Sequence, residues 1–236
     1  MVDIGEAVTY PTESDDFAVT ILIGGGLTIL SFLIVPAILV TGYIVSVLRA
    51  RYDGQPAPPS FGDWETLLMD GLKASAIGLV YMLVPLLVGG VLVGGSVLAL
   101  ATESRSGAAL GFGGIFGSIL LMGVLFVIFG YIAAAGVLNF AHRGSIGDGF
   151  DFERIGTLAT SGDYVVAWAA VIGISIVISV INGMLNFVPI LGSIAGIFVA
   201  FYGQMVMARL LADGYIDTFD LETSPTPSTP TRAEQM

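Results

Sequence analysis

Two short acidic motifs are the residues best suited, by type and spacing, to do chemistry. They share the pattern Asp–aromatic–Glu and comprise Asp63, Trp64, Glu65, Asp151, Phe152 and Glu153. Paired carboxylates can serve as a general acid and base, or they can bind a cation. Alternatively, each aspartate caps a helix, and the glutamate lies in the first turn beside the positive helix end. Side chains two residues apart on a helix diverge, so we favour capping.

No other residue set in the sequence specifies a reaction. His142 is the only histidine, and as a lone imidazole beside Arg143 we expect it to be an interfacial residue. The absence of cysteine excludes thiol catalysis, disulfides and Cys-ligated metal. Nucleophile elbows, phosphate-binding glycine loops and metal-binding histidine pairs are absent as well. We therefore expect no catalytic residue, no cofactor and no metal site.

The acidic motifs lie in loops between stretches that are predicted to span a membrane. Of 236 residues, 55% are hydrophobic and only 11% are charged, and the mean hydropathy is +0.91. Apolar stretches cover roughly residues 17–48, 74–101, 108–141 and 164–211. A span needs about 20 residues, so the last stretch is divided near Phe187–Pro189. The sequence predicts an all-α polytopic transmembrane helical bundle with five spans.

Glycines and prolines indicate where these spans bend or pack. The first stretch is too long for one upright crossing, so it must tilt, protrude or break, and the expected places for a break are Gly24–Gly26 and Pro36. Pro36 and Pro85 are compatible with discontinuous helices that line a substrate site, and equally with passive kinks. Small residues let helices approach closely in lipid, and the candidate packing glycines are Gly25, Gly26, Gly113, Gly114, Gly192 and Gly196. For Gly192 and Gly196, packing within the chain is favoured over a dimer face.

The basic residues predict an orientation. Seven of the eight Lys and Arg residues fall on one side of the predicted spans, and only Arg105 falls on the other. Cytoplasmic loops carry an excess of such residues. We therefore expect a multi-pass protein of the cell membrane whose N-terminus is outside and whose C-terminus is cytoplasmic.

An internal repeat organises the chain. An offset of 88 residues aligns Gly42–Ile44 with Gly130–Ile132, and Asp63–Glu65 with Asp151–Glu153. Each unit would be a span, an inside loop with an interfacial helix, and a second span, and the two units would run parallel. The predicted divisions are an acidic outside segment (1–16), unit one (17–101), unit two (108–187), a fifth span (188–212) and a disordered, acidic, Pro/Thr-rich inside tail (213–236).

The net charge of −11 restricts the partners and suggests a habitat. Nucleic acid is excluded because its phosphates need Lys and Arg. Lys73 is the only lysine, and crowded carboxylates are tolerated where salt screens them. We therefore expect a halophilic archaeon as the source. Membrane lipid and a second copy or another membrane protein are the expected partners.

Particular segments resemble a known family. Three segments are similar to the opening of archaeal membrane proteins catalogued as domain of unknown function 4013, common in haloarchaea: Gly42–Arg49, Pro58–Trp64 and Asp70–Ala74. Gly149–Glu153 and Asp163–Tyr164 resemble the second half of that family. The resemblance implies an integral membrane protein of an archaeon, and it supplies no activity or ligand.

Three classes of function remain open. A non-enzymatic membrane scaffold or protein-interaction module agrees best with glycine-lined spans that lack buried charge. A channel or carrier for a neutral or lipid-like solute is the alternative, which the tandem repeat and the prolines favour. An intramembrane enzyme is the third class.

Overall fold

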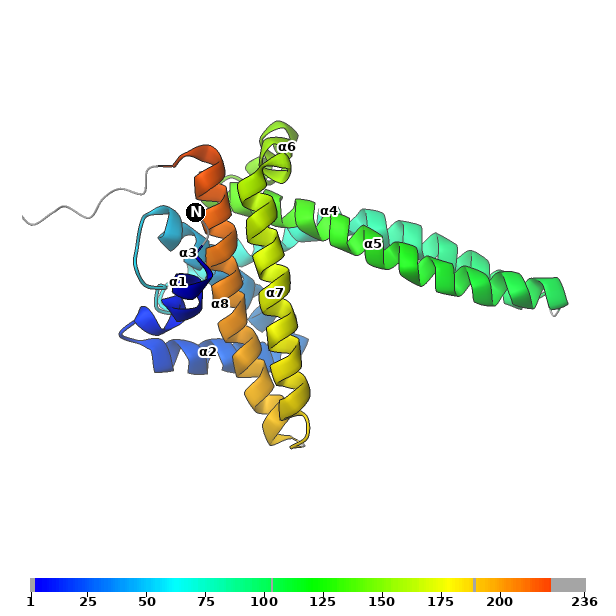
Figure 1. Ribbon diagram of the computed structural model, residues 1–236, viewed down its shortest axis with the longest axis horizontal. Helices are drawn as coiled ribbons and strands as arrows, with labels where there is room; N and C mark the ends of the chain where they lie inside the picture. The colour runs from blue at the N-terminus through cyan, green and yellow to red at the C-terminus, as the bar shows by residue number, and fades with distance from the viewer. Residues whose placement is uncertain (1–2, 103, 189, 222–236) are drawn as a thin grey trace, which may run out of the picture.

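The protein is built from helices joined by short connections. The computed structural model describes residues 3–102, 104–188 and 190–221, and Figure 1 shows how they are arranged. The elements in chain order are α1 (Ile4–Thr9), η1 (Tyr10–Glu13), α2 (Phe17–Ile29), η2 (Leu30–Phe32), α3 (Ile34–Tyr52), α4 (Trp64–Leu100), α5 (Arg105–Arg143), η3 (Ile146–Phe150), α6 (Phe152–Thr160), α7 (Gly162–Leu185) and α8 (Leu191–Phe219). These described ranges contain no strand, which confirms the all-α prediction.

Five of these helices are long and apolar enough to cross a membrane. They are Ile34–Tyr52, Trp64–Leu100, Ser106–Arg143, Gly162–Leu185 and Leu191–Phe219. The segments Ile4–Glu13 and Phe17–Phe32 pass the same test only as a pair, and that pair is bent by 96°. The prediction of five apolar helices is confirmed, and the chain turns between Leu185 and Leu191, where the last apolar stretch was divided.

The first apolar stretch is divided into α2 and α3. The break lies at η2 and Leu33, whose extended backbone (φ −88°, ψ 136°) separates the two helices. Pro36 falls in the first turn of α3, where a missing N–H is tolerated. The expected break at Gly24–Gly26 is wrong, because these glycines lie inside α2. α4 also continues through Pro85 without a break.

The long helices form two hairpins that diverge, in place of the single bundle that we expected. α4 packs along α5 and α7 packs along α8, and the two hairpins extend in different directions (Figure 1). With 37 and 39 residues and a rise of 1.5 Å per residue, α4 and α5 are about 55 and 58 Å long. Gly144 ends α5 in the left-handed conformation (φ 90°), which glycine adopts without strain.

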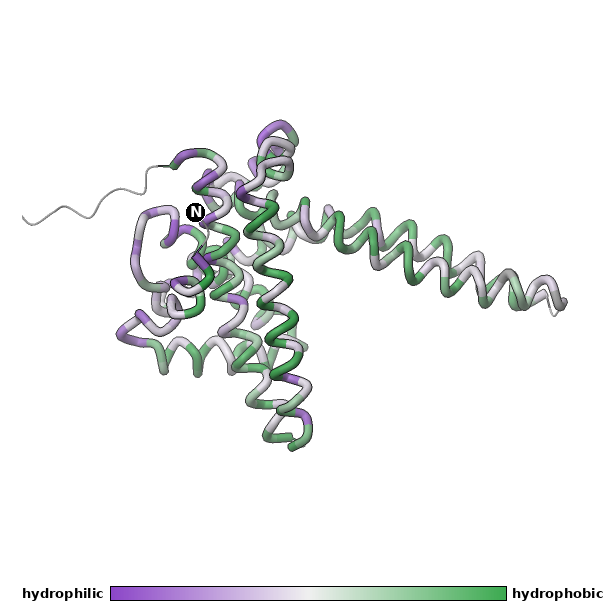
Figure 2. The backbone as a smooth tube through the Cα atoms, in the orientation of Figure 1, coloured by the Kyte–Doolittle hydropathy of each residue, from purple (hydrophilic) through white to green (hydrophobic). Residues whose placement is uncertain are grey.

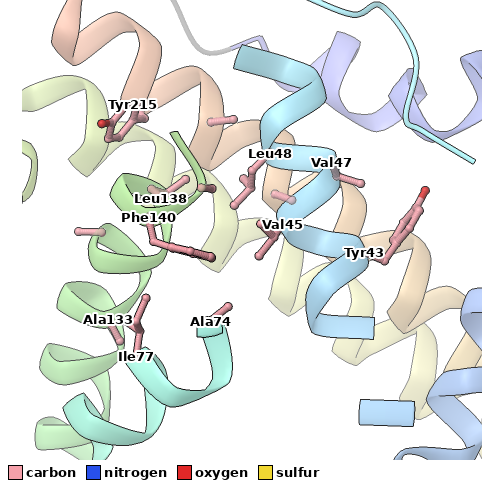
Figure 3. Close-up of a cluster of buried hydrophobic side chains, with 14 of the residues drawn as sticks. Tyr43, Val45, Val47, Leu48, Ala74, Ile77, Ala133, Leu138, Phe140 and Tyr215 are labelled. Atoms are coloured by element: carbon pink, nitrogen blue, oxygen red, sulfur yellow. The ribbon is translucent and has the colours of Figure 1, made fainter. Parts of the chain in front are cut away.

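The hairpins meet at one end of the molecule, which we call the polar end and define by Arg49, Arg51, Arg143, Arg154 and Arg209. Hydrophilic residues concentrate around this end, while the hairpins are largely hydrophobic (Figure 2). The main buried cluster joins α3, α4, α5 and α8 just beside it (Figure 3). The core therefore lies at the junction of the helices, and the distal parts of the hairpins expose large apolar side chains.

Only one of the two predicted interfacial helices forms a separate helix. Residues 64–73 are the first turns of the continuous helix α4, so the expectation of a separate short helix is wrong there. Residues 152–160 do form a separate helix, α6. The difference has a local cause, because Ser161 has extended backbone and its hydroxyl accepts a hydrogen bond from the Tyr164 N–H, which starts α7 as a new helix.

The fifth span is longer than predicted. α8 continues to Phe219, seven residues into the segment that we expected to be disordered. Asp213, Tyr215 and Ile216 are buried there, and this burial explains why the helix persists. The remainder of the predicted tail, residues 222–236, lies outside the described residues.

The N-terminal segment packs at the polar end, on the same face of the molecule as the end of α8. Glu6 forms an ion pair with Arg209, and Glu13 lines a cavity together with Gln55 and Pro56 of the α3–α4 loop. These contacts place the N-terminal segment beside α8, and the sidedness of the two termini relative to a membrane stays a prediction. The stretch that hydropathy predicts as one span forms two helices, α2 and α3, and α3 returns the chain to the polar end.

The two proposed repeat units share one local feature and differ in packing. Asp63 and Asp151 have nearly the same backbone conformation, with φ, ψ of −81°, 85° and −72°, 85°. Elsewhere α3 packs along α4, whereas α7, the counterpart of the second part of α4, packs along α8. The superposition of residues 25–100 on 113–188 stays a prediction.

Candidate functional site

An ion pair between the half-buried Arg49 and the buried Asp70 joins α3 to α4 at the polar end. The Arg49 guanidinium donates from both terminal nitrogens to Asp70, with an Nη2–Oδ1 distance of 3.1 Å, and its Nε donates to the Ala141 carbonyl at 3.2 Å. Asp70 is buried, with 6% of its surface exposed. A two-pronged Arg–carboxylate pair fixes orientation as well as distance, so Arg49 ties α3, α4 and α5 together.

A second set of charges connects α3, α8 and the N-terminal segment. Arg51 Nε donates to Asp213 Oδ1 at 2.5 Å, and Arg209 Nη2 donates to Glu6 Oε2 at 2.8 Å. Arg209 Nε lies 3.7 Å from Asp213 Oδ2, which is an ionic contact beyond hydrogen-bond length. Arg209 and Asp213 are both buried. Removal of one member would leave the other as an uncompensated buried charge, which is costly.

Aromatic residues hold the N-terminal segment in this position. The Arg209 guanidinium lies 4.9 Å from the centre of the Tyr10 ring, and the Tyr202 hydroxyl donates to the Val8 carbonyl. Burial raises the pKa of Tyr10 to about 12, and the charge of Arg209 opposes that rise. The Tyr10 hydroxyl is therefore neutral near pH 7, and this segment docks by packing and by its link to Arg209.

A third set of polar groups surrounds Asn139, which is fully buried in α5. Asn139 Nδ2 donates to the Asp148 carbonyl at 2.6 Å, and its Oδ1 accepts from the Tyr215 hydroxyl at 2.9 Å. The Tyr215 hydroxyl in turn accepts from Arg154 Nε at 3.1 Å. Arg154 also lies over the Phe219 ring at 4.0 Å. This chain of bonds connects α5, η3, α6 and α8.

The polar end is built to hold helices together, and its charges are engaged with one another. Within the described ranges, no group of three or more His, Asp or Glu side chains could hold a metal ion. The His142 ring makes an edge contact with Tyr52 and a tilted contact with Tyr215. It lines a cavity of about 280 Å³ with Arg49, Asp53 and Arg143. In this lining, His142 lies with the carboxylate of Asp53 and with the guanidinium groups of Arg49 and Arg143.

A second cavity, which we call the junction pocket, has the opposite character. It measures about 270 Å³ and lies between α3, α5, α7 and α8. Its lining includes Leu48, Val137, Leu138, Met207 and Leu211. Figure 3 shows Leu48 and Leu138 facing each other across the space between α3 and α5. Gln204 is the polar side chain in a lining that is otherwise apolar.

The acidic motifs predicted from the sequence lie at helix starts. Asp63 Oδ1 accepts from the Thr66 N–H at 3.1 Å, and Asp151 Oδ1 accepts from the Arg154 N–H at 3.2 Å. Hydrogen bonds from Thr66 hold the pKa of Asp63 below its ordinary value of 3.8. Asp151 also accepts from Arg143 at 3.2 Å. Both residues therefore act as N-caps in this structure.

The other members of the motifs lie outside any cluster. Glu65 and Glu153 occupy the first turns of α4 and α6. Trp64 and Phe152 are 46% and 69% exposed. The structure does not gather these carboxylates into one site.

The candidate packing glycines divide into two groups. Gly25, Gly114, Gly192 and Gly196 face other atoms of the chain, namely Phe198, Ser96, the Leu185 carbonyl and the Asn182 side chain. Gly26 and Gly113 face open space. Gly192 and Gly196 thus pack within the chain, as favoured over a dimer face.

Sequence reasoning missed the ion pairs and the close contact between α3 and α4. Arg49 and Asp70 are 21 residues apart, and Arg51 and Asp213 are 162 apart, so no local spacing links them. A Cβ atom on Gly42 would lie 1.8 Å from the Leu67 carbonyl oxygen, which makes the α3–α4 crossing dependent on glycine. The available signal was Asp70, a carboxylate on a helix that continues directly into an apolar span.

The comparisons with known proteins concern the family alone. A family model described as protein of unknown function (DUF4013) matches residues 29–187. No curated protein and no solved structure matches the chain.

Proposed function

Because the chain belongs to the family of proteins of unknown function DUF4013, which carries no assigned activity, we propose its role from its own geometry: a non-enzymatic membrane module that self-associates through the α4–α5 hairpin. Five helices long and apolar enough to cross a membrane indicate a multi-pass membrane protein. The polar end would keep the hairpins in place, and the hairpins would supply the surface for assembly.

One observation supports this proposal more than any other. Gly90 and Gly94 on α4, and Gly113 and Gly117 on α5, are four residues apart on each helix and face open space. Small residues at this spacing let helix backbones approach closely in lipid, where van der Waals contact drives association. Gly192 and Gly196, which have the same spacing, are already occupied by the chain itself. The hairpin glycines are therefore available to another helix.

Large apolar residues flank these glycines. Val91, Phe112 and Phe116 are 75%, 71% and 67% exposed. They would cover the rim of a helix contact and enlarge its area. A second copy of the chain is the partner that we propose, because it offers the same glycine and apolar pattern.

Energy transfer between labelled copies in liposomes tests the proposal. Gly113→Leu and Gly117→Leu should reduce transfer at least threefold, because the added side chains separate the helices. Gly173→Leu is the matched control, since Gly173 of α7 also faces open space but lies on the other hairpin. Equal transfer in all three variants, or no transfer above that of an unrelated membrane protein, would contradict self-association through the α4–α5 hairpin.

The junction pocket favours a second candidate function, a carrier or channel for a neutral or lipid-like solute. Its lining is apolar apart from Gln204, and the hairpins diverge beside it (Figure 1). Liposomes that contain the protein should then exchange a fluorescent lipid between leaflets faster than empty liposomes. An unchanged exchange rate would leave the interaction module as the supported function.

A further inference from the structure

We propose that the junction pocket is a binding site for an apolar molecule that carries one uncharged oxygen, such as a long-chain alcohol or the ester end of a lipid chain. The proposal rests on the membrane location proposed above, and it does not depend on self-association. Two observations support it: the apolar lining of the pocket, and the lack of a hydrogen-bond partner for the Gln204 side chain among the described residues.

The lining selects for an apolar ligand. Side chains from α3, α5, α7 and α8 surround the space, and all of them except Gln204 present hydrocarbon or thioether groups. The volume of about 270 Å³ is close to the lower limit, about 300 Å³, of pockets that hold small molecules. The pocket therefore suits one chain segment, with the remainder of the molecule lying between the hairpins.

The side chain of Gln204 favours a ligand that carries one hydrogen-bonding group. Gln204 is half-buried on α8, and its side chain forms no hydrogen bond with another described residue. An amide in apolar surroundings is stabilised by a hydrogen-bond partner. A ligand oxygen could accept from the Gln204 amide nitrogen, and a hydroxyl could also donate to its oxygen. One uncharged oxygen satisfies this group, whereas a charged group would have to give up its water in an apolar site.

The position of the pocket gives such a molecule a route of entry. Leu48 and Leu211 lie one turn or less from the arginines of the polar end, Arg49 and Arg209, so the pocket begins just beneath the charged layer. The hairpins diverge on the other side (Figure 1). A chain that enters from the bilayer therefore reaches Gln204 without crossing the charged layer.

Two substitutions separate the contributions of shape and of the amide. Ala134 lines the pocket, so Ala134→Phe should fill it and remove binding of every ligand. Gln204→Leu keeps the volume and removes the hydrogen bond, so it should remove only the preference for oxygen. Ala169→Phe is the matched control because Ala169 is exposed on α7 and does not line the pocket.

Native mass spectrometry of the purified, detergent-solubilised chain provides the measurement, with hexadecan-1-ol and hexadecane as probes. We expect one hexadecan-1-ol per chain, bound at least tenfold more tightly than hexadecane. In Gln204→Leu the two probes should bind equally, in Ala134→Phe neither should bind, and Ala169→Phe should behave as the unmodified chain.

A displacement experiment identifies the source of the natural ligand. A phospholipid that copurifies and is displaced by hexadecan-1-ol would identify a bilayer lipid, and binding without displacement would identify a free alcohol or carbonyl compound.

Equal affinity for hexadecane and hexadecan-1-ol in the unmodified chain would overturn the role of Gln204. Loss of binding in Ala169→Phe, or retention in Ala134→Phe, would overturn the pocket assignment. These binding measurements are independent of energy transfer between copies. Failure of the pocket proposal can therefore be distinguished from failure of self-association.

Discussion

At the scale of single residues, charged side chains form ion pairs that connect the ends of helices. Asp70, Arg209 and Asp213 are buried although the chain is treated as a membrane protein, where such groups are expensive. Each is paired with an opposite charge from another helix: Asp70 with Arg49, Asp213 with Arg51, and Arg209 with Glu6. Because these pairs connect segments distant in sequence, they specify which helix ends meet.

The Arg49–Asp70 pair should be essential for stability. Asp70→Asn removes the ionic partner of Arg49, and breaking a buried pair in this way costs about 3 kcal/mol. Thermal unfolding in detergent, followed by tryptophan fluorescence, measures the loss. The double variant Arg49→Met with Asp70→Leu is the control, because it removes both charges and should be closer to the unmodified chain. A single variant as stable as the unmodified chain would show that the pair contributes nothing.

The Asp63 cap should be sensitive to pH in one direction. The pKa of Asp63 is lowered in the folded protein, so its carboxylate stabilises the start of α4 above pH 3.8, and this contribution is lost as the pH falls through the lowered pKa. Hydrogen exchange at the Thr66 amide should therefore quicken in acid. Asp63→Asn keeps an acceptor oxygen and should remove the pH dependence, and Asp63→Ala should exchange quickly at all pH values. Exchange that is independent of pH in the unmodified chain would contradict the role of the carboxylate.

At the scale of elements, close approach and local caps decide where helices end and cross. α3 and α4 cross with Gly42 against the Leu67 carbonyl and Gly71 against the Ile38 carbonyl, at distances that leave no room for a side chain. Ser161 separates α6 from α7, while α4 runs without interruption from its cap at Asp63. These contacts make α3 and α4 one packed unit from which the α4–α5 hairpin extends.

The glycine crossing can be tested with a matched pair. Gly42→Ala should destabilise the protein by roughly 1–3 kcal/mol, because the added carbon meets backbone atoms that cannot move aside. Gly78→Ala in α4 faces open space and should be neutral or stabilise by up to about 1 kcal/mol. Thermal unfolding in detergent compares the two variants. Equal effects would show that α3 and α4 do not depend on close approach.

At the scale of the whole molecule, all the long helices begin or end at one polar end. α3, α5 and α8 run toward it, and α4 and α7 run away from it (Figure 1). The basic residues that define this end would face the cytoplasm if they follow the usual bias of membrane proteins. We therefore propose that the N-terminal segment and the end of α8 are both cytoplasmic.

Cysteine labelling in intact cells tests this arrangement, and the chain has no native cysteine to interfere. Thr12→Cys and Glu153→Cys should both be protected from an impermeant reagent, because both positions are exposed at the polar end. Thr102→Cys, at the tip of the α4–α5 hairpin, should react. If Thr12→Cys and Thr102→Cys were labelled and Glu153→Cys were not, the result would contradict this proposal. It would support the orientation expected from the sequence, with the N-terminus outside.

The acidic surface should make the loops sensitive to salt. Glu13, Asp15 and Asp16 line one cavity with the α3–α4 loop. Their repulsion is screened beyond about 3 Å at 1 M salt and only beyond about 30 Å at 0.01 M. Proteolysis of residues 14–16 and 53–62 should quicken as salt is withdrawn, while helical circular dichroism is retained. Asp15→Asn with Asp16→Asn should reduce the effect, and cleavage rates that do not change with salt would contradict adaptation to a salt-rich cell.

Local properties were sufficient to predict the helical class, the number of apolar helices, the turn between α7 and α8, and the caps at Asp63 and Asp151. Each of these depends on neighbours within a few residues, through hydropathy, proline and glycine positions, or hydrogen bonds to the next turn. The Arg49–Asp70 and Arg51–Asp213 pairs, the junction pocket around Gln204 and the return of α2–α3 to the polar end could not be predicted. They depend on residues far apart in sequence, such as Arg51 and Asp213 at a separation of 162 positions, and the packing of α3 against α4 and α8 decides which of these residues meet. Hydropathy describes each helix against lipid, and only the tertiary structure determines the directions in which the hairpins extend.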